Sequence, residues 1–179
     1  NSLIKKKCVT AIPEMENDQT CAARAIVICM AKLNNDSSLN TLQKQNRAHR
    51  IGPNSQKGRA IELLRQVGLS QYEAVHVKDF FKFEKHLDVQ IVVLDVATGY
   101  NIIYTGETRE NKIFLLKEGE HFHSITNIHG LFACKKVCTS CLTFYSVNAK
   151  HHCEKKCHIC DRKGCEWKEK IYCPDCNRL

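Results

Sequence analysis

The spacing of apolar and polar positions changes along the chain near residue 90. Before that point apolar residues recur at helical intervals, and after it they form short β-branched runs between turn residues. Residues 21–33 are apolar apart from Arg24 and Lys32, so they predict a helix that is buried on most sides. The turn-forming residues 34–38 are expected to end it.

Two further helices are predicted in the first half of the chain. Residues 56–67 place their apolar side chains on one face and stop before Gly68, which is typical of an amphipathic helix. Asp79 is expected to be the N-cap of a short helix that extends to Leu87. Its apolar face should consist of Phe80, Phe81, Phe83 and Leu87.

Four strand-like segments follow, separated by turns that contain Gly or Asn. They cover residues 90–95, 101–105, 112–117 and 121–128. Strands spaced in this way predict an antiparallel meander. Helices followed by a run of strands predict an α+β fold, with helices packed on an antiparallel sheet, rather than alternating βαβ units.

Composition divides the chain near Gly130. Nine of the 12 cysteines lie between Cys134 and Cys176, and residues 131–179 carry +5 of the net charge of +8. We therefore expect one domain over residues 1–130 and a zinc-binding module over residues 131–179. So short a module cannot be stable by core burial alone, so bound metal should supply most of its folding energy.

The cysteine spacing in this module indicates two structural zinc ions. Cys-x2-Cys pairs separated by a loop are the usual frame of a tetrahedral zinc site. Four protein ligands at each site favour structural over catalytic zinc, because catalytic zinc keeps an open position. The predicted ligands are Cys138, Cys141, His151 and Cys153 for the first ion, and Cys157, Cys160, Cys173 and Cys176 for the second.

The division of ligands between the two ions stays open. His152 could replace His151 in the first site, and Cys165 or His158 could enter the second. Cys134 is a spare cysteine that could simply be buried.

Cys21 is the best candidate for a catalytic residue. It opens the apolar helix, where exposed N–H groups and the helix dipole favour a thiolate. His121 begins the last strand-like segment and could act as the base for Cys21 if the two elements lie side by side. This order of cysteine and histidine is the arrangement of papain-like cysteine proteases. Cys29, on the same helix, is expected to be an inert core residue.

Two short motifs resemble the ovarian-tumour (OTU) family of cysteine proteases, most of which are deubiquitinases. The segment 18–21, Asp-Gln-Thr-Cys, matches the family's Asp, two residues and nucleophilic Cys before an apolar helix. The segment 113–116, then His121 and Phe122, match its late strand, turn and His followed by an aromatic residue. The resemblance covers residues 10–130 approximately. It implies a papain-like fold and cleavage after the C-terminal glycine of ubiquitin or a ubiquitin-like protein.

The resemblance also implies roles for residues around Cys21. It places the oxyanion hole at the N–H groups of Cys21 and of the turn 18–20, which Asp18 would hold by accepting backbone hydrogen bonds. Many members carry Asp or Asn two positions after the catalytic His, but this chain has His123 there, which could instead be structural or face substrate. The third catalytic residue is therefore open, with His123, Asp95, Asn127 and Asn17 as candidates.

A second resemblance covers the whole chain. The apolar segment 21–27, the helix around Gly58 and a histidine strand that runs into cysteine pairs are similar to one region of viral and transposon polymerases. That region lies ahead of the polymerase core in protein-primed B-family DNA polymerases of Maverick/Polinton transposons and related viruses. The resemblance implies that the chain is one part of a larger protein of a transposon or a virus-like element.

These features predict a deubiquitinase, a cysteine protease that acts on ubiquitin or polyubiquitin. One alternative is an inactive OTU-like module that binds nucleic acid beside a polymerase, and another is a protease that processes its own parent chain. The basic zinc module could contact DNA, although such charge is also typical of a solvated surface.

Residues 1–8 are charged and precede no hydrophobic stretch, and no apolar run is long enough to span a bilayer. We therefore expect no signal peptide, no membrane partner and an intracellular protein of the cytoplasm or nucleus.

Overall fold

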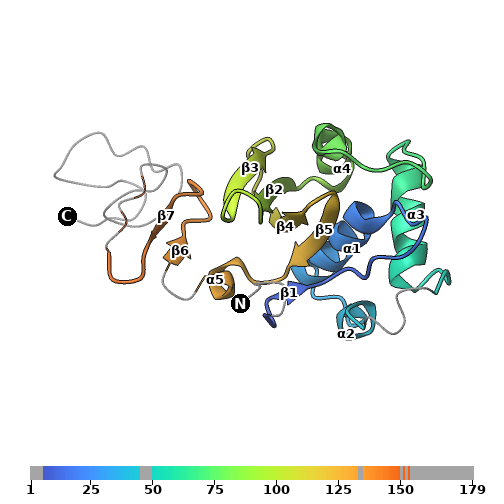
Figure 1. Cartoon of the computed structure of the whole chain (residues 1–179), viewed down its shortest axis with the longest axis horizontal. Coiled ribbons are helices and arrows are strands. Elements are labelled where there is room, and N and C mark those ends of the chain that lie inside the picture. Colours follow the sequence, from blue (N-terminus) through green and yellow to red (C-terminus); the bar gives the residue numbers. More distant parts are fainter. Residues whose placement is uncertain (1–5, 45–49, 133–134, 150, 152, 154–179) are drawn as a thin grey trace, which may run out of the picture. The chain divides into compact units, whose positions relative to one another are not determined.

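The computed structural model describes residues 6–44, 50–132, 135–149, 151 and 153 (Figure 1). The chain divides into two compact units, Asn1–Leu131 and Phe132–Leu179. Helices and strands both occur in the first unit, so the mixed α+β composition is confirmed.

The first unit contains five helices and five strands in its described part. The helices are α1 (Cys21–Leu33), α2 (Leu39–Leu42), α3 (Gln56–Gln66), α4 (Phe80–Leu87) and α5 (Ile128–Leu131), with a 3-10 helix η3 (Val77–Asp79) before α4. The strands are β1 (Val9–Thr10), β2 (Gln90–Asp95), β3 (Asn101–Thr105), β4 (Lys112–Glu118) and β5 (His121–Ile125).

The sheet is not the predicted meander. Its strand order is β1-β5-β4-β2-β3, and β4 pairs with β2 in parallel, while the other three pairings are antiparallel. The reason is burial. Strands β2 and β4 are buried over most of their length, whereas β3 is exposed at every other position. A strand buried on both faces belongs inside a sheet, so β3 takes the edge and β4 pairs on the other side of β2.

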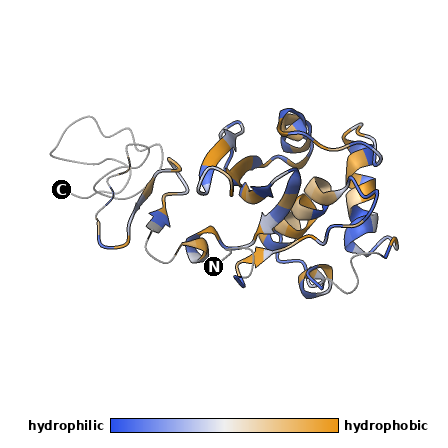
Figure 2. Cartoon of the chain, viewed as in Figure 1, coloured by the Kyte–Doolittle hydropathy of each residue, from blue (hydrophilic) through white to orange (hydrophobic). Residues whose placement is uncertain are grey.

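Helix α1 is the centre of the hydrophobic core. Nine of its 13 residues are buried, and it contacts α2, α3, β4 and β5. Figure 2 shows α1 in pale to orange colours, whereas α3 carries many hydrophilic residues. The burial expected for residues 21–33 is confirmed, because few polar positions interrupt the run.

The predicted helices α3 and α4 are present, with differences in detail. Ser55 caps α3 by accepting a hydrogen bond from the Gly58 N–H, and Gly68 follows the helix at a φ of 71°. Asp79 is the N-cap residue of α4 as predicted, but its carboxylate accepts the N–H of His76 and makes no capping bond to α4. Phe81 is 57% exposed, so its predicted place in the apolar face is wrong.

The last predicted strand is shorter than expected. Strand β5 ends at Ile125, and Ile128 begins the short helix α5 instead of ending the strand. The change occurs at Asn127, whose side chain accepts the N–H groups of His129 and Gly130. An Asn that bonds the backbone two and three residues ahead favours a helical turn over a strand.

The second unit contains an antiparallel hairpin in its described part. Strand β6 (Lys135–Val137) pairs with β7 (Phe144–Ser146). Cys138 and Cys141 lie in the turn between these strands, and the Cys138 N–H donates to the Thr143 carbonyl. Across the described residues of both units, no helix is long and apolar enough to cross a membrane.

Candidate active site and metal centre

Cys21 lies at the N-terminal end of α1, with its side chain half-buried. Thr20 precedes it at the N-cap position but makes no side-chain capping bond, so the first N–H groups of the helix are not covered by that hydroxyl. Cys29, two turns further along, is fully buried beside the Phe114 carbonyl, and burial raises the pKa of its thiol to about 12. The same helix therefore carries one accessible and one inert thiol.

A tight hairpin brings His121 to Cys21. His121 is the first residue of β5 and pairs with Glu118, the last residue of β4, across a turn in which Gly119 adopts a φ of 59°. A side-chain hydrogen bond with Cys21 is the main cause that raises the pKa of His121, against the opposing effect of burial. The structure thus brings together the two residues that the sequence singled out, 100 positions apart.

The second ring nitrogen of His121 bonds to the backbone. His121 Nε2 lies 2.8 Å from the Ile12 carbonyl oxygen. The N–H of Ile12 in turn donates to His123 Nδ1 at 3.1 Å. His123 is 5% exposed, and its ring centre lies 5.0 Å from that of His121.

The other candidates for a third catalytic residue have different contacts. The Asp95 carboxylate accepts the N–H of Ala97 at the C-terminal end of β2, two strands away from β5 in the sheet. The Asn127 side chain bonds the backbone at the start of α5. Asn17 lines the same cavity as Cys21 and has a φ of 58°. Among the described residues, the Ile12 carbonyl is hydrogen-bonded to His121, and Cys21 is the group that raises the pKa of His121 most.

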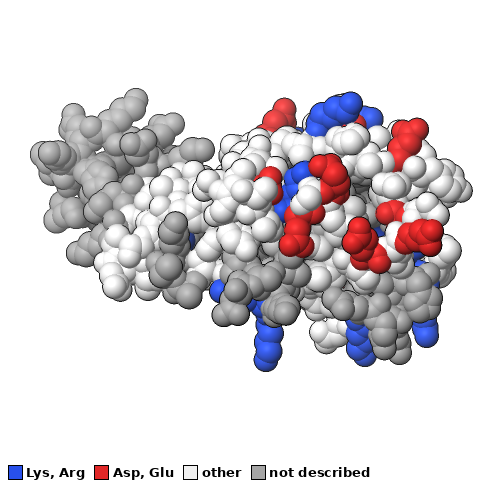
Figure 3. Space-filling model, in the orientation of Figure 1, with Lys and Arg blue, Asp and Glu red and all other residues white. Residues whose placement is uncertain are grey.

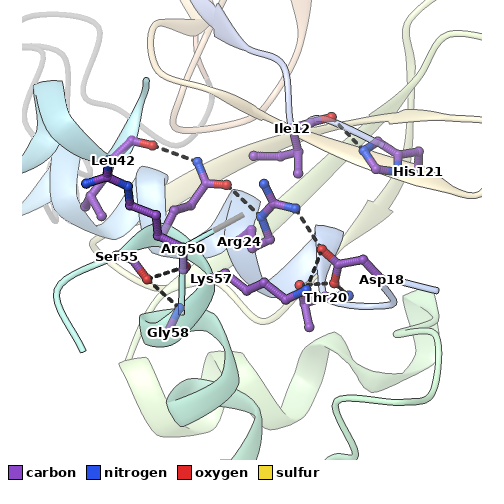
Figure 4. A network of polar contacts seen from close by, with 11 residues as sticks. Ile12, Asp18, Thr20, Arg24, Leu42, Arg50, Ser55, Lys57, Gly58 and His121 are labelled. Carbon is purple, nitrogen blue, oxygen red and sulfur yellow. Dashed lines mark hydrogen bonds and ion pairs between the residues drawn. The ribbon is translucent and has the colours of Figure 1, made fainter. Parts of the chain in front are cut away.

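Asp18 holds the turn before Cys21. Its Oδ1 accepts the Thr20 N–H at 3.1 Å and the Thr20 hydroxyl at 2.5 Å, while its Oδ2 lies 3.0 Å from Arg24 Nη1 and 3.4 Å from Lys57 Nζ (Figure 4). Burial would raise the pKa of Asp18, but the Thr20 bonds and the charges of Lys57 and Arg24 outweigh it and lower that pKa. The backbone-accepting geometry expected of Asp18 is present.

Arg24 is a supporting residue that sequence reasoning missed. Its side chain is 1% exposed, and besides Asp18 it donates from Nε to Gln56 Oε1 at 2.6 Å. Gln56 continues the network by donating to the Leu42 carbonyl at 2.7 Å. Arg24 therefore connects the turn before Cys21 to the start of α3 and the end of α2. The available signal was a single arginine inside an apolar helix, since buried arginines are paired.

Cys21 and His121 open into an acidic cavity of about 930 Å³. Among its described lining residues there are five carboxylates and no lysine or arginine. Asp18 is neutralised by its two cations and Glu120 is paired with Lys117, which leaves Glu14, Glu16 and Glu118 to set the potential. Figure 3 shows acidic groups gathered on this face of the molecule. The cavity is therefore negative, although the whole chain is basic.

In the second unit, four of the eight predicted metal ligands converge. The donor atoms of Cys138, Cys141, His151 and Cys153 all lie within 4.8 Å of one another. The ligand atoms of a tetrahedral zinc site with Zn–S bonds of about 2.3 Å are separated by about 3.8 Å. This cluster of three thiols and one imidazole could therefore hold a metal ion.

The surroundings of the cluster favour metal binding. Burial opposes ionisation of Cys138, but N–H groups of Cys141 and Ser140 and the neighbouring thiols lower its pKa to about 7. Tyr145 stacks on the His151 ring at 4.8 Å and 17°, which fixes the ring orientation. Among the described cysteines there is no disulfide bond. The ligands predicted for the second ion, Cys157, Cys160, Cys173 and Cys176, and the alternatives His152, His158, Cys165 and Cys134 lie outside the described residues.

Comparison with known proteins gives little information about this chain. No protein-family model and no curated protein matches it. Among solved structures, it is weakly similar to the viral OTU domain protease from Farallon virus, with a TM-score of 0.31 and 12% identity over 65% of this chain and 83% of that chain. A likeness of this size does not identify a fold or a family, so the geometry of the site itself has to indicate its chemistry.

Proposed function

We propose that this chain is a cysteine protease of the deubiquitinase type, which hydrolyses isopeptide or peptide bonds at the C-terminus of ubiquitin or a ubiquitin-like protein. The observation that supports it most is that Cys21, at a helix N-terminus, and His121, at a strand start, line the same cavity, where Cys21 raises the pKa of His121. A thiol beside an imidazole is the arrangement that activates a cysteine nucleophile. Ubiquitin as substrate rests on the OTU resemblance of the two motifs.

The reaction would proceed in two halves. In the first, Cys21 transfers its proton to His121 and attacks the carbonyl carbon, and His121 returns the proton to the leaving amine. The product of this half is a thioester between Cys21 and the acyl group. In the second half, His121 takes a proton from water, which attacks the thioester and regenerates the thiol.

The turn before α1 supplies donors for the oxyanion. The Thr20 N–H is already bonded to Asp18, and the Asp18 N–H to the Met15 carbonyl. In this proposal the remaining N–H groups of the turn, those of Gln19 and Cys21, stabilise the tetrahedral intermediate. Such fixed donors contribute several kcal/mol in enzymes, on the order of 3 kcal/mol for one donor.

The charge of the cavity favours a peptide substrate over nucleic acid. Glu14, Glu16 and Glu118 repel phosphate groups and attract lysine or arginine side chains of a substrate tail. An accessible thiol in an acidic cavity therefore fits an extended, positively charged polypeptide. This argues against nucleic-acid binding at the cavity of the first unit.

An electrophilic ubiquitin probe tests the proposal directly. The full-length chain should form a covalent adduct, and Cys21→Ala should form none. Cys29→Ala is the matched control, because that thiol lies on the same helix but is buried, and the adduct should persist. An adduct that survives Cys21→Ala contradicts the assignment of the nucleophile. Cleavage of the parent chain without any ubiquitin adduct would instead identify a self-processing protease.

We further propose that the metal is zinc and that two ions are bound, the second by Cys157, Cys160, Cys173 and Cys176. Thiolate-rich four-ligand sites are typical of structural zinc. Elemental analysis of the purified full chain should find two zinc ions per chain. A content of one, with loss of all metal in Cys138→Ser, would contradict the second site.

Contact between the zinc module and DNA is a second candidate function. Residues 131–179 carry ten basic and five acidic residues, which makes this part of the chain the most positive. Binding to duplex DNA should then weaken steeply with salt, in proportion to the number of phosphates contacted. Binding that is absent at low salt would remove this candidate without affecting the protease proposal.

A further inference from the structure

The backbone of Ile12 lies between two histidines of the neighbouring strand. Strand β1 pairs with β5 through Val9 with Ile125 and Thr10 with Ser124. Continued by two residues, this register places Ile12 opposite Phe122, between His121 and His123, whose side chains share one face of the strand. The strand pairing has ended there, and both polar groups of Ile12 bond to imidazoles instead of to backbone.

The Ile12 carbonyl determines which nitrogen of His121 carries a proton. A carbonyl oxygen only accepts, so Nε2 must be the N–H of the neutral ring. The lone pair is then on Nδ1, which is left to accept the proton of the Cys21 thiol. A carboxylate or amide side chain performs the same task in other cysteine and serine hydrolases.

His123 bonds to the other backbone polar group of Ile12, its N–H. Its Nδ1 accepts the Ile12 N–H, so in the neutral ring the proton is on Nε2. That Nε2 is buried without a hydrogen-bond partner among the described residues, with Glu118 Oε2 at 3.5 Å. A protonated His123 would have no acceptor at Nδ1 and could not hold Ile12.

The chain after Ile12 adds to this restraint. Pro13 follows, and the residue before a proline is confined to extended conformations. The Ile12 side chain is 2% exposed and belongs to the core around α1. The carbonyl is therefore held by packing, by Pro13 and by the His123 bond.

We propose that the Ile12 carbonyl takes the place of the third catalytic side chain, and that His123 is the positioning residue that holds this carbonyl against His121. The proposal rests on the proposed roles of Cys21 and His121. It explains how a chain with His at the second position after the catalytic His can still orient that residue.

The electrostatics agree with this geometry. The groups that face His123 are His121 and Glu118, and those that face His121 are Cys21 and Glu14. Burial, and then the charge of His121, lower the pKa of His123, while Cys21 raises that of His121. The pKa of His123, which must stay neutral, and the pKa of His121, which must accept a proton, are thus shifted in opposite directions.

Long-range proton–nitrogen NMR of the full chain tests the assignment without any substrate. With neutral rings, His121 should have its proton on Nε2 and His123 should have Nδ1 unprotonated. A His121 ring with its proton on Nδ1, or a His123 ring with a protonated Nδ1, would overturn the proposal.

A matched pair of variants tests the positioning role. In His123→Asn the amide oxygen can occupy the place of Nδ1 and accept the Ile12 N–H, whereas the similarly shaped His123→Leu cannot. The rate at which iodoacetamide alkylates Cys21, followed by mass spectrometry of its peptide across pH 5 to 9, should be close to wild type in His123→Asn. In His123→Leu we expect about a 10-fold loss near neutral pH, because small displacements of a catalytic group are costly.

Turnover separates positioning from binding and from the proposed substrate. On a fluorogenic ubiquitin substrate, His123→Leu should lower kcat about 10-fold and leave KM unchanged. If ubiquitin is not a substrate, the alkylation profiles and the tautomers still decide the role of His123. Equal alkylation profiles for His123→Leu and wild type would overturn it. If His123→Leu does not fold, the tautomers measured in the wild type decide between the two outcomes.

Discussion

Cysteine and histidine side chains meet in both units of this protein, but with different numbers of partners. In the first unit one thiol, Cys21, meets one catalytic candidate, His121, whose other nitrogen bonds to a backbone carbonyl. In the second unit three thiols and His151 point at a common centre, within 4.8 Å of one another. The first arrangement offers one thiol and one imidazole between which a proton could pass, and the second offers four donor atoms to a metal ion.

The supports of the two clusters also differ. The turn before Cys21 is held by a buried ion pair between Asp18 and Arg24, inside a core of helices and strands. The cluster around Cys138 lies on a short two-stranded hairpin, for which a bound metal would be the main source of stability. Residue type alone therefore does not distinguish a nucleophile from a ligand, whereas the number of convergent donors does.

Loss of the base of the first cluster should have the strongest effect. His121→Ala should lower the alkylation rate of Cys21 and kcat/KM on a ubiquitin substrate by about 100- to 10,000-fold at neutral pH, because general-base assistance is lost. His151→Ala is the comparison from the second cluster and should leave both quantities near wild type. A similar loss in the two variants would remove the distinction between the clusters.

Removal of a ligand should affect the second cluster alone. Cys138→Ser is expected to weaken metal binding by more than about 100-fold, since even residues that merely support a ligand contribute 10- to 100-fold. Metal content of the full chain, measured after dialysis against a weak chelator, checks this. Cys21 should still be alkylated at the wild-type rate, and a strong decrease would mean that the catalytic site depends on the metal.

The ion pair beneath Cys21 should matter for stability. Asp18→Asn keeps an oxygen for the Thr20 bonds but leaves Arg24 buried without a counter-charge, which we expect to cost about 3 kcal/mol of unfolding free energy. Denaturant unfolding measures it. Glu62→Gln, in an exposed pair with Arg65, is the control and should cause no measurable change.

The effect of Asp18→Asn should depend on pH in one direction. The pKa of Asp18 is lowered in the folded chain, so its charge stabilises the fold above the ordinary value of 3.8. This contribution is lost as the pH falls through the lowered value. The difference between wild type and Asp18→Asn should therefore shrink in acid, and a difference that grows there would contradict the ion-pair explanation.

A shift in the titration of His121 should be the weakest of these effects. Its pKa is raised above the ordinary value of 6.5, mainly by Cys21, so Cys21→Ala should lower it, as NMR titration would show. The linked stability is complete below 6.5 and is lost as the pH rises through the raised value. The stability difference between wild type and Cys21→Ala should accordingly decrease at alkaline pH.

Features that depend on neighbours along the chain could be predicted from the order of amino acids alone. The apolar run 21–33 predicts a buried helix because burial excludes charge. The run begins at Cys21, after the polar residues 17–20, so the sequence also predicts that Cys21 is the first residue of the helix. The pair Cys138 and Cys141 predicts two metal ligands because a single turn brings the two thiols together. The mixed α+β composition followed from the change in apolar spacing near residue 90.

Features that depend on which strands become neighbours were settled by the folded chain. The parallel pairing of β2 with β4 follows from burying both strands in the middle of the sheet, which no local turn encodes. The same sheet brings β1 beside β5 and so places Ile12 between His121 and His123. Every residue has a backbone carbonyl, so no side-chain motif in the sequence could predict that the Ile12 carbonyl is the partner of His121.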